Sequence, residues 1–432
     1  MATTPALQSL DKRLTPWNSL DRLKASLVFI ILADLLFLAA LFVGESKHHS
    51  LLQTIGKDAA PSIIAAQHIK VAIADMDAEA VDELLAKPGE AKAATDEYNA
   101  RREEAAGELI TAAQNITYGD AERTPIKTLQ IGLGEYETAI QRARDFHERN
   151  DPQAISIYRQ ASKILDGKLL SAADALDKAN GDVLEETFDS DRTSATETRI
   201  AIVWAGIVLV ALLAKTQWDL VRKVHRLINP GLLAAFILAL GLTFYSAAHL
   251  SRAAEDLRIA KQDAFTSIHA LWQARALAYT ARAQESRYLF QADSALDEAS
   301  FRENAKNVDK FLASEMSNIT FSGERDAATE TVDTWRTYLA IDSQIKQLKN
   351  NGNNLAAIQL YLGKKSGQSN FQFARFDDAL MRTEKINHDA FDNSVASGFA
   401  QLDKFKLIAS VCAAAIAVFS AIGLLVRIRE YL

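Results

Sequence analysis

The residues best suited to bind a ligand lie along one stretch of predicted helix in the second half of the chain. Trp272, Arg275, Tyr279 and Arg282 are spaced by three, four and three residues, which places them along one flank of a helix. Two guanidinium groups one heptad apart, beside aromatic rings, suit a small molecule that carries a carboxylate. We therefore predict a ligand-binding site at these four residues. The alternative is a helix face held in ion pairs, Arg282 with Glu285 and Arg275 with a carboxylate from another helix.

A carboxyl group also interrupts an apolar run close to the N-terminus. Asp34 lies at the middle of the run from Ala25 to Gly44. An ionisable group is costly inside a membrane and by default marks a functional site with a polar partner. We predict that Asp34 acts in intramembrane coupling or in docking another membrane protein. The alternative is a protonated carboxyl group that hydrogen bonds to a neighbouring span.

Chemistry of other kinds is not indicated by the sequence. The one cysteine, Cys412, excludes an intramolecular disulfide framework and a thiolate zinc site. His48 and His49 are adjacent, so on a helix they point in different directions and cannot chelate a metal together. We find no catalytic nucleophile, phosphate loop or metal cluster, and the net charge of -7 gives no sign of a nucleic-acid-binding surface. The sequence predicts a non-enzymatic protein without cofactor or metal.

The composition indicates which elements must position these residues. Of the 432 residues 49% are apolar and 24% charged, and only 18 are glycine and 7 proline, which favours long uninterrupted helices. The apolar residues concentrate in four runs, each close to the length that crosses a hydrocarbon core as a helix. These runs are Ala25 to Gly44, Ile200 to Ala214, Leu232 to Ala248 and Leu407 to Val426. The predicted fold class is therefore an all-α membrane protein, with transmembrane helices at 25–44, 199–215, 229–248 and 406–427.

Lysine and arginine residues beside the spans predict their orientation. They cluster before span one, between spans two and three, and after span four, at Lys12, Arg13, Arg22, Lys24, Lys215, Arg222, Lys223, Arg226, Arg427 and Arg429. By the positive-inside rule both termini are cytoplasmic, and residues 45–198 and 249–405 lie outside a plasma membrane. The predicted cytoplasmic segments, 1–24, 216–228 and 428–432, hold no kinase or other output module. An inward signal would therefore pass through a separate cytoplasmic partner.

The two long segments resemble each other at a fixed separation. Asn115-Ile116-Thr117-Tyr118 recurs 203 residues later as Asn318-Ile319-Thr320-Phe321, and Ala154-Ile155, Tyr158 and Phe188-Asp189 recur at the same separation. One ungapped register predicts a tandem duplication, with two parallel halves related by a pseudo-twofold axis along the membrane normal. In that register the four candidate ligand-binding residues correspond to Ile69, Ala72, Met76 and Glu79, so the candidate site belongs to the second half alone.

Helix-breaking residues divide each long segment into four helices. The breaks fall at 87–89, 118–120 and 150–152 in the first half, and at 292–294, 322–324 and 350–354 in the second. Apolar steps of three and four predict bundle seams at Ile126, Leu129, Leu133, Tyr136, Ile140 and Ala143, at Leu165, Leu169, Ala172, Leu176, Ala179 and Val183, and at Leu257, Ala260, Ala264, Ser267, Leu271, Ala274, Ala278 and Ala281. We predict two tandem extracytoplasmic antiparallel four-helix bundles, whose first and fourth helices continue into the spans as a mechanical link.

Two further patterns each have a local and a functional interpretation. The Asn-Ile-Thr triplets at 115–117 and 318–320 match a glycosylation sequon, but both end a predicted helix, so a role in the turn is the simpler interpretation. Small residues recur every four positions in spans three and four, at Ala235, Ala239, Thr243, Ala247, Ala409, Ala413, Ala417 and Ala421. This spacing lets helix backbones approach closely, and it favours packing within the chain over a homodimer interface.

Each half, with a span at either end of four helices, resembles the four-helix-bundle sensor unit of bacterial chemoreceptors and histidine kinases. The resemblance covers both halves and rests on architecture. It implies that ligand-contacting arginines on the bundle helices, at a dimer interface, correspond here to Arg275 and Arg282. The chain departs from that family in lacking the linker and output modules after the last span. Its four-span layout is also similar to bacterial membrane proteins that relay the state of an extracytoplasmic amino-acid-binding lipoprotein to a cytosolic serine/threonine kinase.

These observations lead to two functional hypotheses. The first is a non-enzymatic membrane sensor or signal-relay protein, which couples an extracytoplasmic small ligand or solute-binding protein to a cytoplasmic kinase or other effector through its transmembrane helices. The second is a structural or assembly scaffold of the cell envelope that binds other membrane or envelope proteins. A transporter is the least favoured hypothesis, because the spans contain few polar groups besides Asp34 that would line a path.

Overall fold

The computed structural model describes residues 19–224, 229–290 and 295–429. Within these ranges the regular secondary structure is helical, without strands, in agreement with the predicted all-α class. The described residues form two compact units, a span unit (19–51, 189–255 and 397–429) and a head unit (52–188 and 256–396). Four predicted features lie wholly or partly outside the described residues: the N-terminal segment with Lys12 and Arg13, the loop around Arg226, the helix break at 292–294 and the C-terminal segment 428–432.

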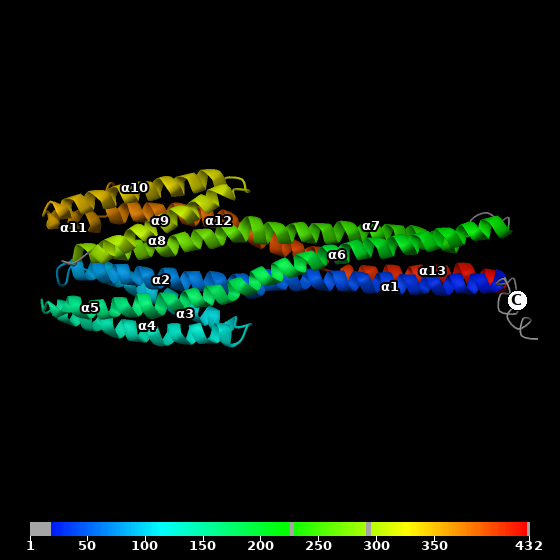
Figure 1. Cartoon of the computed structure of the whole chain (residues 1–432), viewed down its shortest axis with the longest axis horizontal. Helices are drawn as coiled ribbons and strands as arrows, with labels where there is room; N and C mark the ends of the chain where they lie inside the picture. Colours follow the sequence, from blue (N-terminus) through cyan, green and yellow to red (C-terminus); the bar gives the residue numbers. More distant parts are fainter. Residues whose placement is uncertain (1–18, 225–228, 291–294, 430–432) are drawn as a thin grey trace, which may run out of the picture. The chain divides into compact units, whose positions relative to one another are not determined.

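The span unit is built from α1 (Ser19–Gln53), the C-terminal part of α6 (Leu170–Val224), α7 (Pro230–Arg258) and α13 (Phe405–Arg429) (Figure 1). Four helical stretches are long and apolar enough to cross a membrane: Leu20–Leu85, Thr196–Arg222, Pro230–Phe290 and Ser369–Arg429. Three of them contain a predicted span, and Pro230–Phe290 contains all but the first residue of the span predicted at 229–248. Large apolar side chains such as Leu36 and Phe244 lie exposed on these helices, as expected of surfaces that face lipid. The chain is thus consistent with a multi-pass membrane protein.

Small residues let the span helices α7 and α13 approach closely. A side-chain carbon added at Gly231 would lie 2.7 Å from the carbonyl oxygen of Phe419. Asn229 joins the same two helices, because its amide donates a hydrogen bond to the carbonyl of Gly423 at 2.8 Å. Four residues of the predicted small-residue stripes are buried: Ala235, Ala239, Ala409 and Ala413. These contacts favour the interpretation of the stripes as packing within the chain.

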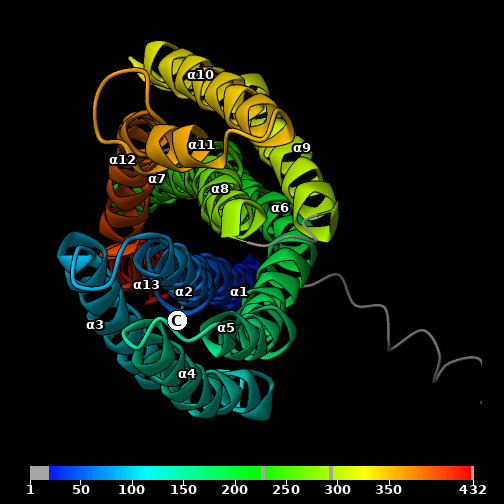
Figure 2. The same cartoon turned by 90° about the vertical axis from the view of Figure 1, so that its left-hand side faces the viewer.

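The head unit contains two sets of helices in chain order. The first set is α2 (Ala60–Leu85), α3 (Lys92–Gln114), α4 (Asp120–His147), α5 (Gln153–Ile164) and the N-terminal part of α6. The second set is α8 (Thr266–Phe290), α9 (Ala295–Ser317), α10 (Glu324–Asn350), α11 (Asn354–Leu362) and α12 (Ser369–Leu402). Figure 2 shows α2 and α8 side by side, with α3, α4 and α5 beyond α2 and α9, α10 and α11 beyond α8.

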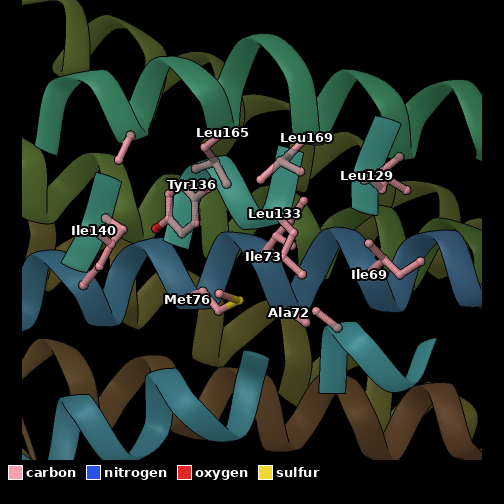
Figure 3. Close-up of a cluster of buried hydrophobic side chains, with 14 of the residues drawn as sticks. Ile69, Ala72, Ile73, Met76, Leu129, Leu133, Tyr136, Ile140, Leu165 and Leu169 are labelled. Atoms are coloured by element: carbon pink, nitrogen blue, oxygen red, sulfur yellow. The ribbon is translucent and has the colours of Figure 1, made fainter. Parts of the chain in front are cut away.

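An apolar core fills the first set of helices. Residues of α2 there meet residues of α4 and of a π-helical turn, η3 (Leu165–Leu169), as Figure 3 shows for Ile69, Ala72, Ile73, Met76, Leu129, Leu133, Tyr136, Ile140, Leu165 and Leu169. The predicted seam of α4 is confirmed, since all six of its residues are buried. The predicted seam of the next helix is right as far as Leu176. Beyond it the buried residues are Asn180, Leu184 and Phe188, while Ala179 and Val183 are only half-buried.

The two central helices α2 and α8 are buried on almost every face. The predicted seam from Leu257 to Ala281 is buried throughout, and so are the arginines on other faces of α8. The matching stretch of α2 likewise buries Asp75, Asp77, Glu79 and Asp82. A helix that is buried all round carries no strong amphipathic pattern. The sequence therefore indicated the seam of α8 but not that its charged side faces another helix.

A π-helical turn precedes each central helix, η2 (Thr54–Ala59) before α2 and η4 (Ile259–Phe265) before α8. A π turn departs from the α-helical hydrogen-bond pattern, so a backbone carbonyl within it can accept a bond from elsewhere. The amide of Asn115 donates to the carbonyl of Asp58 at 2.9 Å, and that of Asn318 to the carbonyl of Asp263 at 2.8 Å. Both Asn-Ile-Thr triplets thus fasten a turn to a π-helical segment, in line with the simpler of their two interpretations.

These matching contacts correct the register that relates the two sets of helices. The asparagines are 203 residues apart, whereas their partners are 205 apart, both for Asp58 and Asp263 and for the hydroxyls of Ser62 and Ser267. The ungapped register of 203 is therefore wrong along α2 and α8. The physical reason is a difference of two residues in the spacing of the next helix: α2 ends at Leu85 and α3 begins at Lys92, whereas α8 ends at Phe290 and α9 begins at Ala295.

The fourth helix of the second set is broken twice, which the sequence analysis missed. In the first set α5 continues through η3 into α6, but in the second α11 ends at Leu362 and α12 begins at Ser369. Gly367 in this gap has a φ of 84°, which side-chain-bearing residues rarely adopt. A second break separates α12 from α13, where Lys404 has a φ of 61°. The predicted unbroken continuation of the fourth helix into its span is therefore wrong in the second half.

Candidate functional site

The structure separates the four predicted ligand-binding residues into two pairs. Trp272 and Arg275 both bind to α12 within the second set of helices, although the ring of Trp272 also lies 4.0 Å from that of His68 on α2. The guanidinium of Arg275 makes a bidentate ion pair with Asp377, with Nε 2.6 Å from Oδ1 and Nη2 2.8 Å from Oδ2. The indole of Trp272 donates to Oε1 of Glu384 at 3.2 Å. For Arg275 these contacts match the alternative interpretation, an ion pair with a carboxylate from another helix.

Arg282 instead crosses from α8 to α2. Its Nη1 lies 2.9 Å from Oδ1 of Asp75, and its Nη2 lies 2.7 Å from Oε1 of Glu79 and 2.9 Å from Oδ2 of Asp82. All four side chains are buried. The ion pair that the sequence suggested, between Arg282 and Glu285, is replaced by these contacts. A guanidinium with three carboxylate partners holds the two central helices together.

Arg287, five residues further along α8, makes a second buried contact between α8 and α2. Its Nη2 lies 2.5 Å from Oδ2 of Asp77, and its Nε donates to the hydroxyl of Tyr158 at 2.9 Å. Asp77 also accepts hydrogen bonds from Tyr158 at 3.0 Å and Tyr136 at 3.1 Å. Arg287 and the acidic residues of α2 were not among the site residues predicted from the sequence. Their signal is the presence of charged residues in helices that are otherwise apolar on every side.

The ion pairs of Arg282 and Arg287 with α2 occupy equivalent positions in the two central helices. At the separation of 205 residues, Asp77 corresponds to Arg282 and Asp82 to Arg287. Asp82 binds Arg282 and Asp77 binds Arg287, so the two contacts exchange when the helices are exchanged. The sign of the charge is opposite at each pair of equivalent positions. α2 supplies only acids to these contacts and α8 supplies only arginines.

A cavity of about 500 Å³ lies beside Arg282, where α2, α3, α8 and α12 meet. Of the predicted ligand-binding residues, Tyr279 and Arg282 line it, whereas Trp272 and Arg275 do not. Its acidic lining residues are Asp75, Glu79, Asp82, Glu90, Glu97, Asp377 and Asp378, and its basic ones are Arg101, Arg282 and Lys364. The volume falls in the range that binds small molecules, roughly 300–1,000 Å³. This cavity is the candidate ligand site of the head unit.

Burial changes the acidity of two carboxyl groups in the cavity wall. It raises the pKa of Asp75 to about 7, against the opposing effect of Arg282 and with a further rise from Glu79. Burial likewise raises the pKa of Asp82 to about 7, with the same two neighbours acting in the same directions. The pKa of both carboxyl groups is raised because burial disfavours their charged form by more than the neighbouring guanidinium of Arg282 favours it.

Asp34 lies in the span unit, on α1. Its side chain is 2% exposed, and its Oδ1 has no hydrogen-bond partner among the described residues. The neutral alternative expects a hydrogen bond to a neighbouring span, and the described contacts supply none for this atom. The role of Asp34 in coupling stays a prediction.

The comparisons with known proteins give a match to the first half of the head unit. Residues 51–189 match the family model described as an Actinobacterial sensor domain. The match covers η2, α2, α3, α4, α5 and the first part of α6, including the acidic residues that bind Arg282 and Arg287. No curated protein and no solved structure matches the chain. The family match supports a bacterial sensor domain within this helical protein.

Proposed function

We propose that this chain is a non-enzymatic membrane sensor or signal-relay protein, whose head unit lies outside the plasma membrane as two tandem four-helix modules. The observation that carries the proposal is the buried contact of Arg282 with Asp75, Glu79 and Asp82 beside a cavity of about 500 Å³. A ligand in this cavity touches helices from both modules at once. The match of residues 51–189 to a sensor domain supports the same class of function.

The physical basis is that a ligand shifts an equilibrium only through a difference in its affinity for two arrangements. A buried guanidinium shared by three carboxylates makes the pairing of α2 with α8 sensitive to any charge placed beside it, because the local dielectric is low. A bound ligand would therefore favour one relative position of α2 and α8 over another. Small sliding or rotation of packed helices is a known form of such a change.

The route from the cavity to the membrane follows the chain. α1, η2 and α2 are consecutive helical segments, and so are α7, η4 and α8, without a loop between them. A displacement of α2 against α8 would thus be passed along the backbone to α1 and α7. We propose that a cytoplasmic kinase or other effector receives this displacement, and that Asp34 on α1 takes part in the coupling. An extracytoplasmic solute-binding protein in place of a free ligand, and a homodimer, belong to the same proposal.

The test is a distance measurement on the full-length protein in lipid nanodiscs. In a Cys412→Ser background, spin labels at Leu36 and Phe244, which are exposed on α1 and α7, report the separation of the spans. Labels at Val28 and Leu36 of α1 alone form the control pair. We expect a ligand found by thermal-shift screening of amino acids, amines and dicarboxylates to change the first distance and not the second.

Two outcomes separate sensing from a scaffold. If ligands raise the melting temperature but leave the distance between α1 and α7 unchanged, relay through the spans is refuted and a binding scaffold is favoured. If no small molecule or envelope protein stabilises the head unit, sensing is refuted as well. Replacing Arg275 and Arg282 by alanine is not a clean test, because Asp377 and the three carboxylates around Arg282 would be left buried without a partner.

A further inference from the structure

We propose that the cavity beside Arg282 binds a small organic cation, a molecule that carries an ammonium or guanidinium group. This inference rests on the proposed function, since it names the ligand class of the same site. It replaces the carboxylate-bearing ligand that the arginine spacing suggested.

The arginines of the cavity are already bound to carboxylates of the protein. Arg282 has three acidic partners on α2. Arg101 of α3 lies 2.8 Å from Asp75, 2.6 Å from Glu97 and 2.6 Å from Glu104. A carboxylate ligand would have to displace these partners and would then lie among the acids it displaced. The arginines therefore serve to neutralise part of the acidic wall and are not free to bind an anion.

The cavity wall keeps an excess of negative charge. Seven of its lining residues are acidic and three are basic, and five acids remain when Asp75 and Asp82, whose pKa burial raises to about 7, are protonated. Asp378 on α12 and Glu90 before α3 are both exposed at this wall, so solvent-borne ligands can reach them. A cleft lined by one sign of charge concentrates molecules of the opposite sign. An amine or guanidinium group is thus attracted to this cavity, and a carboxylate is repelled.

The aromatic residues of the wall suit the same ligand. Tyr279 and Phe373 line the cavity with their ring centroids 4.8 Å apart, at 77° to each other. Each ring already holds a guanidinium, that of Arg275 at 5.5 Å from Tyr279 and that of Arg282 at 5.5 Å from Phe373. Rings in this arrangement stabilise cations through the negative charge of their faces. The stem of an organic cation would pack on the ring edges.

A metal ion is a poorer fit than an organic cation. Among the described residues, no three histidine, cysteine, aspartate or glutamate side chains are placed to hold one ion. The acids are spread over α2, α3, α12 and the segment before α3, around a cavity of about 500 Å³. Spread acids bind an extended molecule with one or two positive groups better than a point charge.

The experiment uses full-length protein in nanodiscs and isothermal titration with three probes. Putrescine and agmatine are the cations, and succinate is an anion of the same length as putrescine. We expect both cations to bind with saturation and to raise the melting temperature, and succinate to do neither. Binding of succinate without binding of either cation would overturn the inference, and so would the absence of cation binding at millimolar concentration.

Charge reversal at the exposed wall assigns the binding to this cavity. Asp378→Lys adds a positive charge to the wall, whereas Asp326→Lys makes the same change at an exposed acid of α10 that does not line the cavity. We expect Asp378→Lys to weaken cation binding by about tenfold or more, the loss of one charge-assisted contact plus repulsion. Asp326→Lys should leave it unchanged. Both variants should melt as the parent does, and equal cation affinity in the two would refute this site.

The outcomes also distinguish this inference from the proposed function. If putrescine binds in the cavity but the distance between the labels on α1 and α7 does not change, the ligand class stands and relay fails. If that distance responds to a solute-binding protein or to a dicarboxylate while no cation binds, relay stands and the ligand class is wrong.

Discussion

The two central helices of the head unit fold alike but carry opposite charges. α2 and α8 each follow a π-helical turn that is fastened by an asparagine. At equivalent positions, however, α2 has Asp77 and Asp82, and α8 has Arg282 and Arg287. In a symmetric pair of identical helices position 77 would meet position 82, so like charges would face each other. The charges therefore favour the pairing of α2 with α8 and oppose the pairing of either helix with a copy of itself.

A second comparison concerns an ion pair that both halves keep with the same sign. Lys70 binds Asp174 in the first half, with Nζ 2.5 Å from Oδ1, and Arg275 binds Asp377 in the second. The two aspartates differ in exposure, since the side chain of Asp174 is 57% exposed and that of Asp377 is 17% exposed. The two halves therefore place equivalent pairs in unlike surroundings, and the pairs should differ in energy.

The largest effect on the free energy of unfolding should come from removing the ion pair of Arg287 with Asp77. Arg287→Leu leaves Asp77 fully buried with only the hydroxyls of Tyr136 and Tyr158 as partners. We expect a loss of about 3–5 kcal/mol of unfolding free energy, as for other buried pairs that lose one partner. Unfolding curves followed by tryptophan fluorescence measure it.

The double variant Asp77→Asn with Arg287→Leu is the control for this prediction. It removes both charges, so it should recover much of the lost stability. A loss below about 1 kcal/mol in Arg287→Leu alone would contradict the idea that opposite charges hold the halves together.

The next effect should distinguish the two equivalent ion pairs. Arg275→Met leaves the mostly buried Asp377 without its bidentate partner, and we expect it to cost about 2 kcal/mol. Lys70→Met removes a pair with an exposed partner and should cost less than about 1 kcal/mol. The two midpoints of urea unfolding provide the comparison. Equal losses in the two variants would mean that burial does not set the difference.

A smaller effect should be equal in the two halves. Asn115→Ala and Asn318→Ala each remove the hydrogen bonds to a π-turn carbonyl and to a serine hydroxyl. We expect each to cost about 1–2 kcal/mol, because a carbonyl and a hydroxyl lose their donor. Gln114→Ala, at an exposed neighbouring position, is the matched control and should change little. A costly change at one asparagine and a neutral one at the other would argue against equivalent turns.

The smallest effect should appear in the pH dependence of stability. Burial raises the pKa of Asp75 and Asp82 in α2 to about 7, and the pKa of Glu285 in α8 to about 8. The folded state binds more protons than the unfolded state between the two pKa values of each group, so stability falls as pH rises through that window. For Asp75 and Asp82 the fall ends near pH 7, and for Glu285 it continues to about pH 8.

The test compares melting temperatures at pH 6, pH 7 and pH 8. Glu285 faces Tyr338, Ser369, Asp342 and Lys346, and Asp342 adds to its raised pKa. Glu285→Gln should flatten the decline between pH 7 and pH 8, whereas Asp82→Asn should flatten the part below pH 7. Each group contributes a slope of at most about 1.4 kcal/mol per pH unit. An identical pH profile in the two variants would contradict the separate assignment of the windows.

The helices and most of their buried faces could be predicted from the sequence, because the spacing of apolar residues states which side of a helix is buried. The seams of α4 and of the segment up to Ala281 were right for that reason. The break at Gly363 to Gly367 was missed, since the first half continues as a helix at the matching place and the repeat was extended over it. Spacing along one helix also says nothing of a partner that is 200 or more residues away, such as Asp82 for Arg282.

The candidate site shows the same limit. The pattern at Trp272, Arg275, Tyr279 and Arg282 identified a helix with unusual residues, and two of them line the cavity. Which charges surround them depends on the register of α2 against α8. The ungapped register of 203 paired Arg282 with Glu79 as its equivalent, and the shift to 205 replaces that residue by Asp77. A difference of two residues between the end of one helix and the start of the next was enough to hide the opposite charges at equivalent positions of α2 and α8.

The hydrogen bonds of Asn115 and Asn318 to the π-helical turns affect how this protein can be produced. Each Asn-Ile-Thr triplet matches the acceptor pattern of N-glycosylation in a eukaryotic secretory pathway. The nitrogen that would carry the sugar is the atom that donates to the carbonyl of Asp58 or Asp263 and to a serine hydroxyl. A glycan added before folding would leave that nitrogen with a single hydrogen and a bulky substituent facing the π turn. Yeast or insect-cell expression should therefore yield less folded protein than a bacterial host.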